Sequence, residues 1–183
     1  EEGDGKTILS TWLARLAAKA GERVLLIDAN LRDPSVHKAL NGKNTTSLVE
    51  FLSGKATLEA ITDKTDPSGL HAIYGRSIPN SVMNLLSSDK MGELLKEVRW
   101  TYDLIIIDTP PCLARADARA ISPYADLLLY LASWNKTKRD VIHKGLSQFL
   151  DFSDIRPALV LSNIDLRKHV EYGFGEVICE DDA

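Results

Sequence analysis

The stretch GDGKTILSTWLARLAAKAGERVLLID, residues 3–28, decides the fold class. It begins with a Gly-rich turn that ends in Gly-Lys-Thr, and a helical pattern of apolar residues follows over 6–20. Gly21 ends the predicted helix, and the apolar run 23–28 has the form of a buried parallel strand. A loop, a helix and a strand in this order are typical of a phosphate-binding α/β protein.

The rest of the chain alternates strand and helix patterns. Apolar runs predict strands at 70–74, 102–111, 126–132 and 157–163. Helical patterns cover 33–62 in short pieces, 80–98 in one or two pieces, 113–121 and 137–149. This alternation predicts an α/β fold with a doubly wound, mostly parallel sheet flanked by helices. We expect one domain over 1–165 and a flexible, polar C-terminal tail over 166–183.

The first helix has one strongly apolar side. Its apolar residues fall on one face at helical spacing, and we expect this face, Trp12 included, to pack into the core: Ile8, Leu9, Trp12, Leu13 and Leu16.

Composition excludes some classes of function. With 22 basic and 26 acidic residues the net charge is −4, which argues against nucleic acid as a partner. No apolar run reaches the roughly 20 residues that a membrane-spanning helix needs. If the protein works at a membrane, we expect the anchor to lie outside this segment or on a partner.

Polar residues follow the predicted strands where the strands end. Asp28, Asp108 and Asn163 each close a strand, and parallel strands bring such ends to one edge of the sheet. Gly3 and Gly5 would let backbone N–H groups point at phosphate oxygens. The chemistry matches a nucleoside triphosphate with Mg²⁺, in which a lysine neutralises phosphate charge and a hydroxyl and a carboxylate serve the metal: Lys6, Thr7 and Asp108.

A strand in the middle of the sheet normally precedes a phosphate loop directly, and the sequence as given contains no residues before Glu1 that could form it. We expect that this strand is missing from the chain as given, or that a remodelled sheet covers the gap. If the domain begins at Glu1, we expect weak nucleotide binding, which a micromolar or tighter affinity for ATP would contradict.

Three motifs carry a resemblance to a known family: GDGKT at 3–7, VLLIDANLRDPSVHKAL at 24–40, and YDLIIIDTPP at 102–111 followed by Asp117-Ala118. Together they resemble the cytoplasmic domain of bacterial tyrosine kinases (BY-kinases) of the polysaccharide co-polymerase type. These belong to the deviant P-loop ATPases that include MinD and ParA. The resemblance runs from the first residue to about Asp165.

The resemblance implies site residues and cofactors. ATP or ADP with Mg²⁺ would bind at the P-loop (Walker A) and toward the last strand: Gly3, Asp4, Gly5, Lys6, Thr7, Ile8 and Asn163. The metal would be held or oriented by Thr7, Asp28 and Asp108, the last matching the Walker B aspartate. Catalysis would rest on Lys6, Asp28, Asn30, Arg32 and Asp108.

The sequence departs from the family pattern at two positions. Asn30 replaces the second carboxylate of D-x-D-x-R, and an amide cannot accept a proton as a general base. This argues against robust kinase turnover but not against nucleotide binding. Glu1, or a position before it, stands where MinD and ParA carry a signature lysine, which weighs against a partitioning ATPase. Asp117 either supports the metal site or caps a helix.

The resemblance also implies an acceptor, partners and a location. Tyr172 in the tail is the leading phosphoacceptor, modified by a neighbouring subunit of a ring-type homo-oligomer. A membrane-spanning co-polymerase module, in cis or in trans, and the polysaccharide polymerase and export machinery would be partners at the cytoplasmic face of the inner membrane. The implied function is a tyrosine autokinase that regulates exopolysaccharide or capsule synthesis and export. The alternatives are a nucleotide-binding regulatory module without kinase activity and a MinD/ParA-like ATPase.

Overall fold

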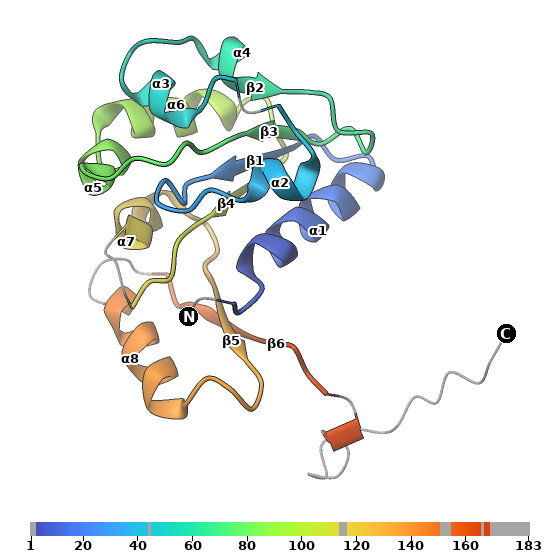
Figure 1. Cartoon of the computed structure of the whole chain (residues 1–183), viewed down its shortest axis with the longest axis vertical. Helices are drawn as coiled ribbons and strands as arrows, with labels where there is room; N and C mark the ends of the chain where they lie inside the picture. Colours follow the sequence, from blue (N-terminus) through green and yellow to red (C-terminus); the bar gives the residue numbers. More distant parts are fainter. Residues whose placement is uncertain (1–2, 44, 114–116, 151–154, 166, 169–183) are drawn as a thin grey trace, which may run out of the picture.

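The computed structural model describes residues 3–43, 45–113, 117–150, 155–165 and 167–168. In chain order, as Figure 1 shows, the elements are α1 (Lys6–Lys19), β1 (Val24–Asp28), α2 (Val36–Leu40), α3 (Leu48–Leu52), α4 (Leu58–Ile61), β2 (Thr62–Asp63), β3 (His71–Ile73), α5 (Val82–Leu86), α6 (Asp89–Val98), β4 (Leu104–Asp108), α7 (Asp117–Ile121), a 3₁₀ turn η1 (Ser122–Tyr124), β5 (Leu129–Ser133), α8 (Arg139–Leu150) and β6 (Ala158–Ser162).

The strands form a four-stranded sheet in the order β2-β3-β1-β4 and a two-stranded sheet of β5 and β6. β1 is parallel to both β3 and β4, and β5 is parallel to β6, while the short β2 is antiparallel to β3. The α/β fold with a mostly parallel sheet is confirmed, and each expected strand is present. The two-residue β2 escaped prediction because it carries no apolar pattern.

Strand β1 is the centre of the core, because all its residues are buried. Side chains of a strand alternate between its two faces. Leu25 and Ile27 therefore pack among apolar side chains of α3, α5 and α6. Val24 and Leu26 pack against α1 and α2 on the other face. Helices on both faces explain why this strand is continuously apolar.

Helix α1 packs differently from the expectation. Thr11 and Ala14 are its buried residues, and their small side chains let the helix lie close to β1 and β4. Three of its larger apolar residues are exposed instead: Trp12 is 73% exposed, Leu16 68% and Ile8 65%. The prediction that Trp12 lies in the core was therefore wrong, because the apolar spacing of this helix does not coincide with its contact face.

A groove of about 570 Å³ separates β4 from β5. Across the described part of the chain, β4 pairs only with β1 and β5 pairs only with β6. Figure 1 shows β5, β6 and α8 below the four-stranded sheet. Leu9 and Leu13 of α1 line the groove together with residues of both strands. The alternative of a remodelled sheet that covers the gap is wrong for the described residues, and a strand that feeds the loop remains a prediction.

Two alanine substitutions test this packing. We expect Leu26→Ala to lower the free energy of unfolding by about 2–5 kcal/mol, because Leu26 is fully buried in the central strand and the change leaves a cavity. The matched change Trp12→Ala removes a larger but exposed side chain and should cost about 0.5 kcal/mol or less. Urea unfolding followed by circular dichroism measures both. A larger loss for Trp12→Ala than for Leu26→Ala would contradict the described packing of α1.

Candidate nucleotide and metal site

Two aspartates meet at the carboxyl edge of the four-stranded sheet. Asp28 and Asp108 are register partners at the ends of β1 and β4. The two strand ends are tied further by a hydrogen bond of 2.8 Å from the Ala29 N–H to the Asp108 carbonyl oxygen. Asp28 is 0% exposed and Asp108 is 2% exposed. Strand pairing thus fixes two buried carboxyl groups side by side.

The loop before α1 has the backbone of a phosphate cradle. Gly3 and Gly5 have φ values of +83° and +81°, which residues with a Cβ rarely adopt. Gly5 is the N-cap of α1, and its carbonyl oxygen accepts the first helical hydrogen bond from the Leu9 N–H at 2.8 Å. The first N–H groups of the helix and its positive dipole end therefore face the loop, as an anion site needs.

The Thr7 hydroxyl connects this loop to the aspartates. It donates a hydrogen bond of 2.5 Å to Oδ2 of Asp108. Ser10, one turn further along α1, donates to Oδ1 of Asp108 at 3.3 Å, and the Ser35 hydroxyl donates to Thr7 Oγ1 at 3.1 Å. Sequence reasoning missed both serines. The i,i+3 spacing of Ser10 from Thr7 was a usable signal, whereas the contact of Ser35 depends on how the chain turns after β1.

Asp28 is held by backbone amides of the segment that follows β1. Its carboxylate accepts hydrogen bonds from the N–H groups of Asn30, Ser35 and Val36 at 3.1, 3.0 and 3.1 Å. Burial nevertheless raises the pKa of Asp28 to about 7, the charge of Asp108 adds to the rise, and the amide hydrogen bonds oppose it. Burial also raises the pKa of Asp108, against the hydrogen bonds from Thr7 and Ser10.

These residues fit a Mg²⁺ ion. Two buried carboxyl groups and a hydroxyl offer the hard oxygen atoms that Mg²⁺ prefers, and a divalent cation would offset the cost of ionising both acids. Where the structure describes the chain, His, Cys, Asp and Glu form no cluster of three that could hold a metal. A site with few protein ligands suits a Mg²⁺ ion that is also bound by phosphate oxygens.

The residues after Asp28 are engaged with other parts of the chain. The Asn30 side chain donates to the Asp33 carbonyl oxygen at 2.8 Å and accepts from the Asp33 N–H at 3.2 Å. Arg32 forms a bidentate ion pair with Asp117 at the start of α7, with distances of 2.7 and 3.2 Å. Asp117, whose role the sequence left open, therefore anchors the arginine.

The other residues that the sequence assigned to the site lie in different parts of the structure. Lys6 Nζ lies 3.9 Å from a carboxylate oxygen of the buried Asp4 within the loop. Asn163 follows β6, and its amide donates to the Ser133 hydroxyl at 2.8 Å, which joins the ends of β6 and β5. The Ile8 side chain is exposed, so only its backbone can serve the phosphate site. Tyr172 and Glu1 lie outside the described residues.

The raised pKa of Asp28 makes stability depend on pH. The folded protein keeps the Asp28 proton up to about pH 7, whereas an unperturbed aspartate releases it near 3.8. The folded protein binds this proton more tightly than the unfolded chain does, so the bound proton stabilises the fold. This stabilisation is complete below about pH 4 and is lost as the pH rises to about 7. Over this range the free energy of unfolding falls by no more than about 1.4 kcal/mol per pH unit. We expect Asp28→Asn to flatten this slope, as measured by urea unfolding in metal-free buffer at several pH values. Parallel profiles for the two proteins would show that Asp28 does not cause the dependence.

The Arg32–Asp117 pair predicts an asymmetry between two substitutions. The side chain of Asp117 is 2% exposed and that of Arg32 is 30% exposed. Arg32→Ala leaves a buried carboxylate without its cation and should cost about 3 kcal/mol or more. Asp117→Ala leaves a guanidinium that reaches water and should cost about 1–2 kcal/mol. Thermal unfolding of both variants and of the double variant measures this. Equal losses would contradict the buried position of Asp117.

Comparison with known proteins places this geometry in a family. The family model described as an AAA domain matches residues 2–154. The tyrosine-protein kinase YwqD of Bacillus subtilis is 35% identical over 172 residues, which are 94% of this chain and 73% of YwqD. For several other tyrosine-protein kinases the chain covers only 20–23% of their length.

Solved structures agree with the sequence comparisons. The kinase domain of the Escherichia coli tyrosine kinase ETK superimposes with a TM-score of 0.85 and 28% identity, over 90% of this chain and 64% of that chain. The septum site-determining protein MinD of Pyrococcus horikoshii, solved with Mg-ADP, matches with a TM-score of 0.73 and 21% identity, over 88% of this chain and 66% of that chain. The likeness to MinD, at 21% identity, establishes a shared fold alone.

The geometry and the comparisons agree. The geometry consists of the loop and helix start at Gly3 to Thr7 and the paired aspartates on β1 and β4. The chain belongs to the family of bacterial tyrosine-protein kinases with a P-loop nucleotide-binding fold.

Proposed function

We propose that this chain is the ATP-dependent tyrosine autokinase domain of a protein that regulates exopolysaccharide or capsule synthesis and export. The observation that carries the proposal is the hydrogen bond from Thr7, on the phosphate loop, to Asp108, beside the buried Asp28. This arrangement supports the proposal, because phosphoryl transfer from a nucleotide requires amides for the phosphates and a hydroxyl and carboxyl groups for the metal, close together.

The proposal gives each of these residues a role in binding. The N–H groups of the Gly3 to Thr7 loop would hold the phosphates of ATP, and Lys6 would neutralise their charge. Thr7, Asp28 and Asp108 would hold Mg²⁺, which would neutralise the negative charge that develops during phosphoryl transfer. Asn163 would face the adenine from the end of β6. The family membership and the oxygen-rich geometry support ATP and Mg²⁺ as ligands.

Asp28 is suited to accept the proton of the reaction. A tyrosine hydroxyl oxygen of a neighbouring subunit, Tyr172 in our proposal, would form a bond to the γ-phosphorus of ATP. The bond from that phosphorus to the β,γ-bridging oxygen would break, and its electron pair would leave on ADP. Asp28 would take the phenolic proton, since it is a carboxyl group at the end of β1, beside Asp108 and the phosphate loop. Asn30 and Arg32 would orient the groups around it.

The assembly follows from the chemistry of the acceptor. A tail tyrosine phosphorylated by a neighbour implies at least transient contact between subunits, which we propose occurs in a ring-type homo-oligomer. None of the described helices is long and apolar enough to cross a membrane. From the family to which the chain belongs, we propose that the domain works at the cytoplasmic face of the inner membrane through a membrane-spanning co-polymerase module and contacts the polysaccharide polymerase and export machinery.

One observation favours a second function. Asn30 is an amide whose side chain is bound to the backbone of Asp33. A site with one carboxylate fewer suits a regulatory module that binds nucleotide and controls a membrane partner without transferring phosphate. The two functions differ in whether phosphotyrosine forms.

Mass spectrometry after incubation with Mg²⁺-ATP tests the proposal. We expect phosphate on Tyr172, none in Lys6→Ala, and none at this position in Tyr172→Phe. Asn30→Asp should raise the rate by about tenfold or more, since a second carboxylate adds a proton acceptor. Asn80→Asp, an exposed asparagine outside the site, is the matched control and should leave the rate unchanged. Bound nucleotide without phosphotyrosine in any of these proteins would favour the regulatory module.

A further inference from the structure

The loop between β5 and α8 lies against the phosphate loop. The Thr137 hydroxyl donates a hydrogen bond of 3.5 Å to the buried Asp4. Lys136 Nζ lies 3.5 Å from the position that a Cβ atom on Gly3 would occupy. Lys136 thus places its ammonium group beside the backbone of the phosphate loop, where Gly3 has no side chain.

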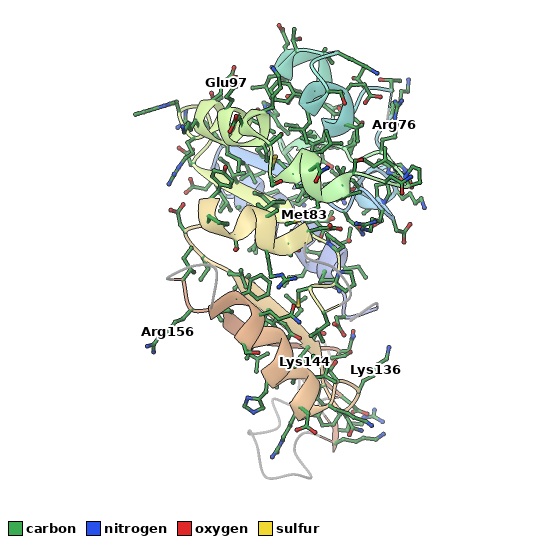
Figure 2. The ribbon with its side chains drawn as sticks, turned by 90° about the vertical axis from the view of Figure 1, so that its left-hand side faces the viewer. Arg76, Met83, Glu97, Lys136, Lys144 and Arg156 are labelled. Carbon is green, nitrogen blue, oxygen red and sulfur yellow. The ribbon has the colours of Figure 1, made fainter. Side chains whose placement is uncertain are left out.

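The loop that carries Lys136 is fixed by hydrogen bonds to the end of β5. The Ser133 carbonyl oxygen accepts from the N–H groups of Lys136 and Thr137 at 3.2 and 3.0 Å. The Ser133 N–H donates to Thr137 Oγ1 at 3.0 Å, so this hydroxyl joins β5 to Asp4. The backbone of Lys136 is therefore held at the site by neighbours on both sides. Figure 2 shows Lys136 on this loop, at the end of the molecule that also holds α8.

Charge at the phosphate loop calls for another cation. The described part of the loop contains one acid, the buried Asp4, and one lysine, Lys6. Asp108 adds a buried carboxyl group that is hydrogen-bonded to Thr7 of this loop. A nucleoside triphosphate brings several more negative charges. With Lys6 and one Mg²⁺ ion as the cations, the site with bound nucleotide would still carry net negative charge. Lys136, which comes from a different element, is a further cation at the loop.

We propose that Lys136 is a phosphate-binding residue of the nucleotide site, which contacts the phosphate chain of ATP or ADP from the β5–α8 loop. The inference deepens the proposed function and rests on it. Lys136 would compensate for the acidic loop, while Thr137 and Ser133 position it. Lys138 and Arg139 follow on the same segment, but the contacts to Gly3 and Asp4 come from Lys136 and Thr137.

The test measures the affinity of the whole chain for a fluorescent ATP analogue and for ADP by anisotropy, with Mg²⁺ present. We expect Lys136→Met to weaken binding of both by about tenfold, since a charge-assisted hydrogen bond is lost. Lys136→Arg keeps the charge and should bind within about threefold of the original protein. Lys138→Met removes a neighbouring exposed lysine and is the matched control, expected to have no effect. Thermal unfolding temperatures should be equal among all four proteins.

The outcomes separate this inference from the proposed function. If Lys136→Met binds both nucleotides as tightly as the original protein, while Lys6→Ala loses binding, the role of Lys136 is wrong and the nucleotide site stands. If Lys138→Met weakens binding as much as Lys136→Met does, general charge explains the effect and the specific contact is overturned. If the original protein binds neither nucleotide, the proposed function and this inference both fail.

Discussion

The pairing of β1 with β4 is the constraint on which the site depends. Five register pairs bring the last residues of the two strands together, so Asp28 and Asp108 become neighbours at one sheet edge. Helices on both faces bury this edge, and burial raises the pKa of both acids. Two adjacent buried carboxyl groups are costly unless protonated or bound to a cation. This cost is consistent with the divalent metal site that we propose, and the Thr7 hydroxyl joins the two carboxyl groups to the phosphate loop.

Local sequence patterns were sufficient to predict the fold and the loop. The Gly-rich turn and the strand that ends at Asp28 lie in one stretch of the sequence, 3–28. Each is recognised from a pattern of only a few neighbouring residues. The contacts of Arg32 with Asp117 and of Ser35 with Thr7 join residues far apart in the sequence, and no periodic pattern marks them. Trp12 shows the limit of periodicity, because apolar spacing reveals a helix face but not what covers it.

The groove between β4 and β5 could not be located from the composition or from the pattern of apolar residues in the sequence. A strand that leads into the phosphate loop remains a prediction from the sequence. The groove is lined by Leu9 and Leu13 of α1 together with both flanking strands. Lys6 and Asp108 also line it, so the groove is continuous with the proposed nucleotide site. Packing in this groove would affect both stability and the position of the loop, because the same residues contribute to each.

We propose that the phosphate loop, Thr7 and the paired aspartates form one site for a metal ion and a nucleotide. The decisive experiment is a crystal structure of the chain with Mg²⁺ and a non-hydrolysable ATP analogue. We expect phosphates along the Gly3 to Thr7 loop and Mg²⁺ about 2.1 Å from Thr7 Oγ1. Asp28 and Asp108 should contact the ion directly or through its water ligands. A nucleotide bound elsewhere, or a Thr7–Asp108 hydrogen bond that persists with the metal remote from both residues, would show that they do not form one site.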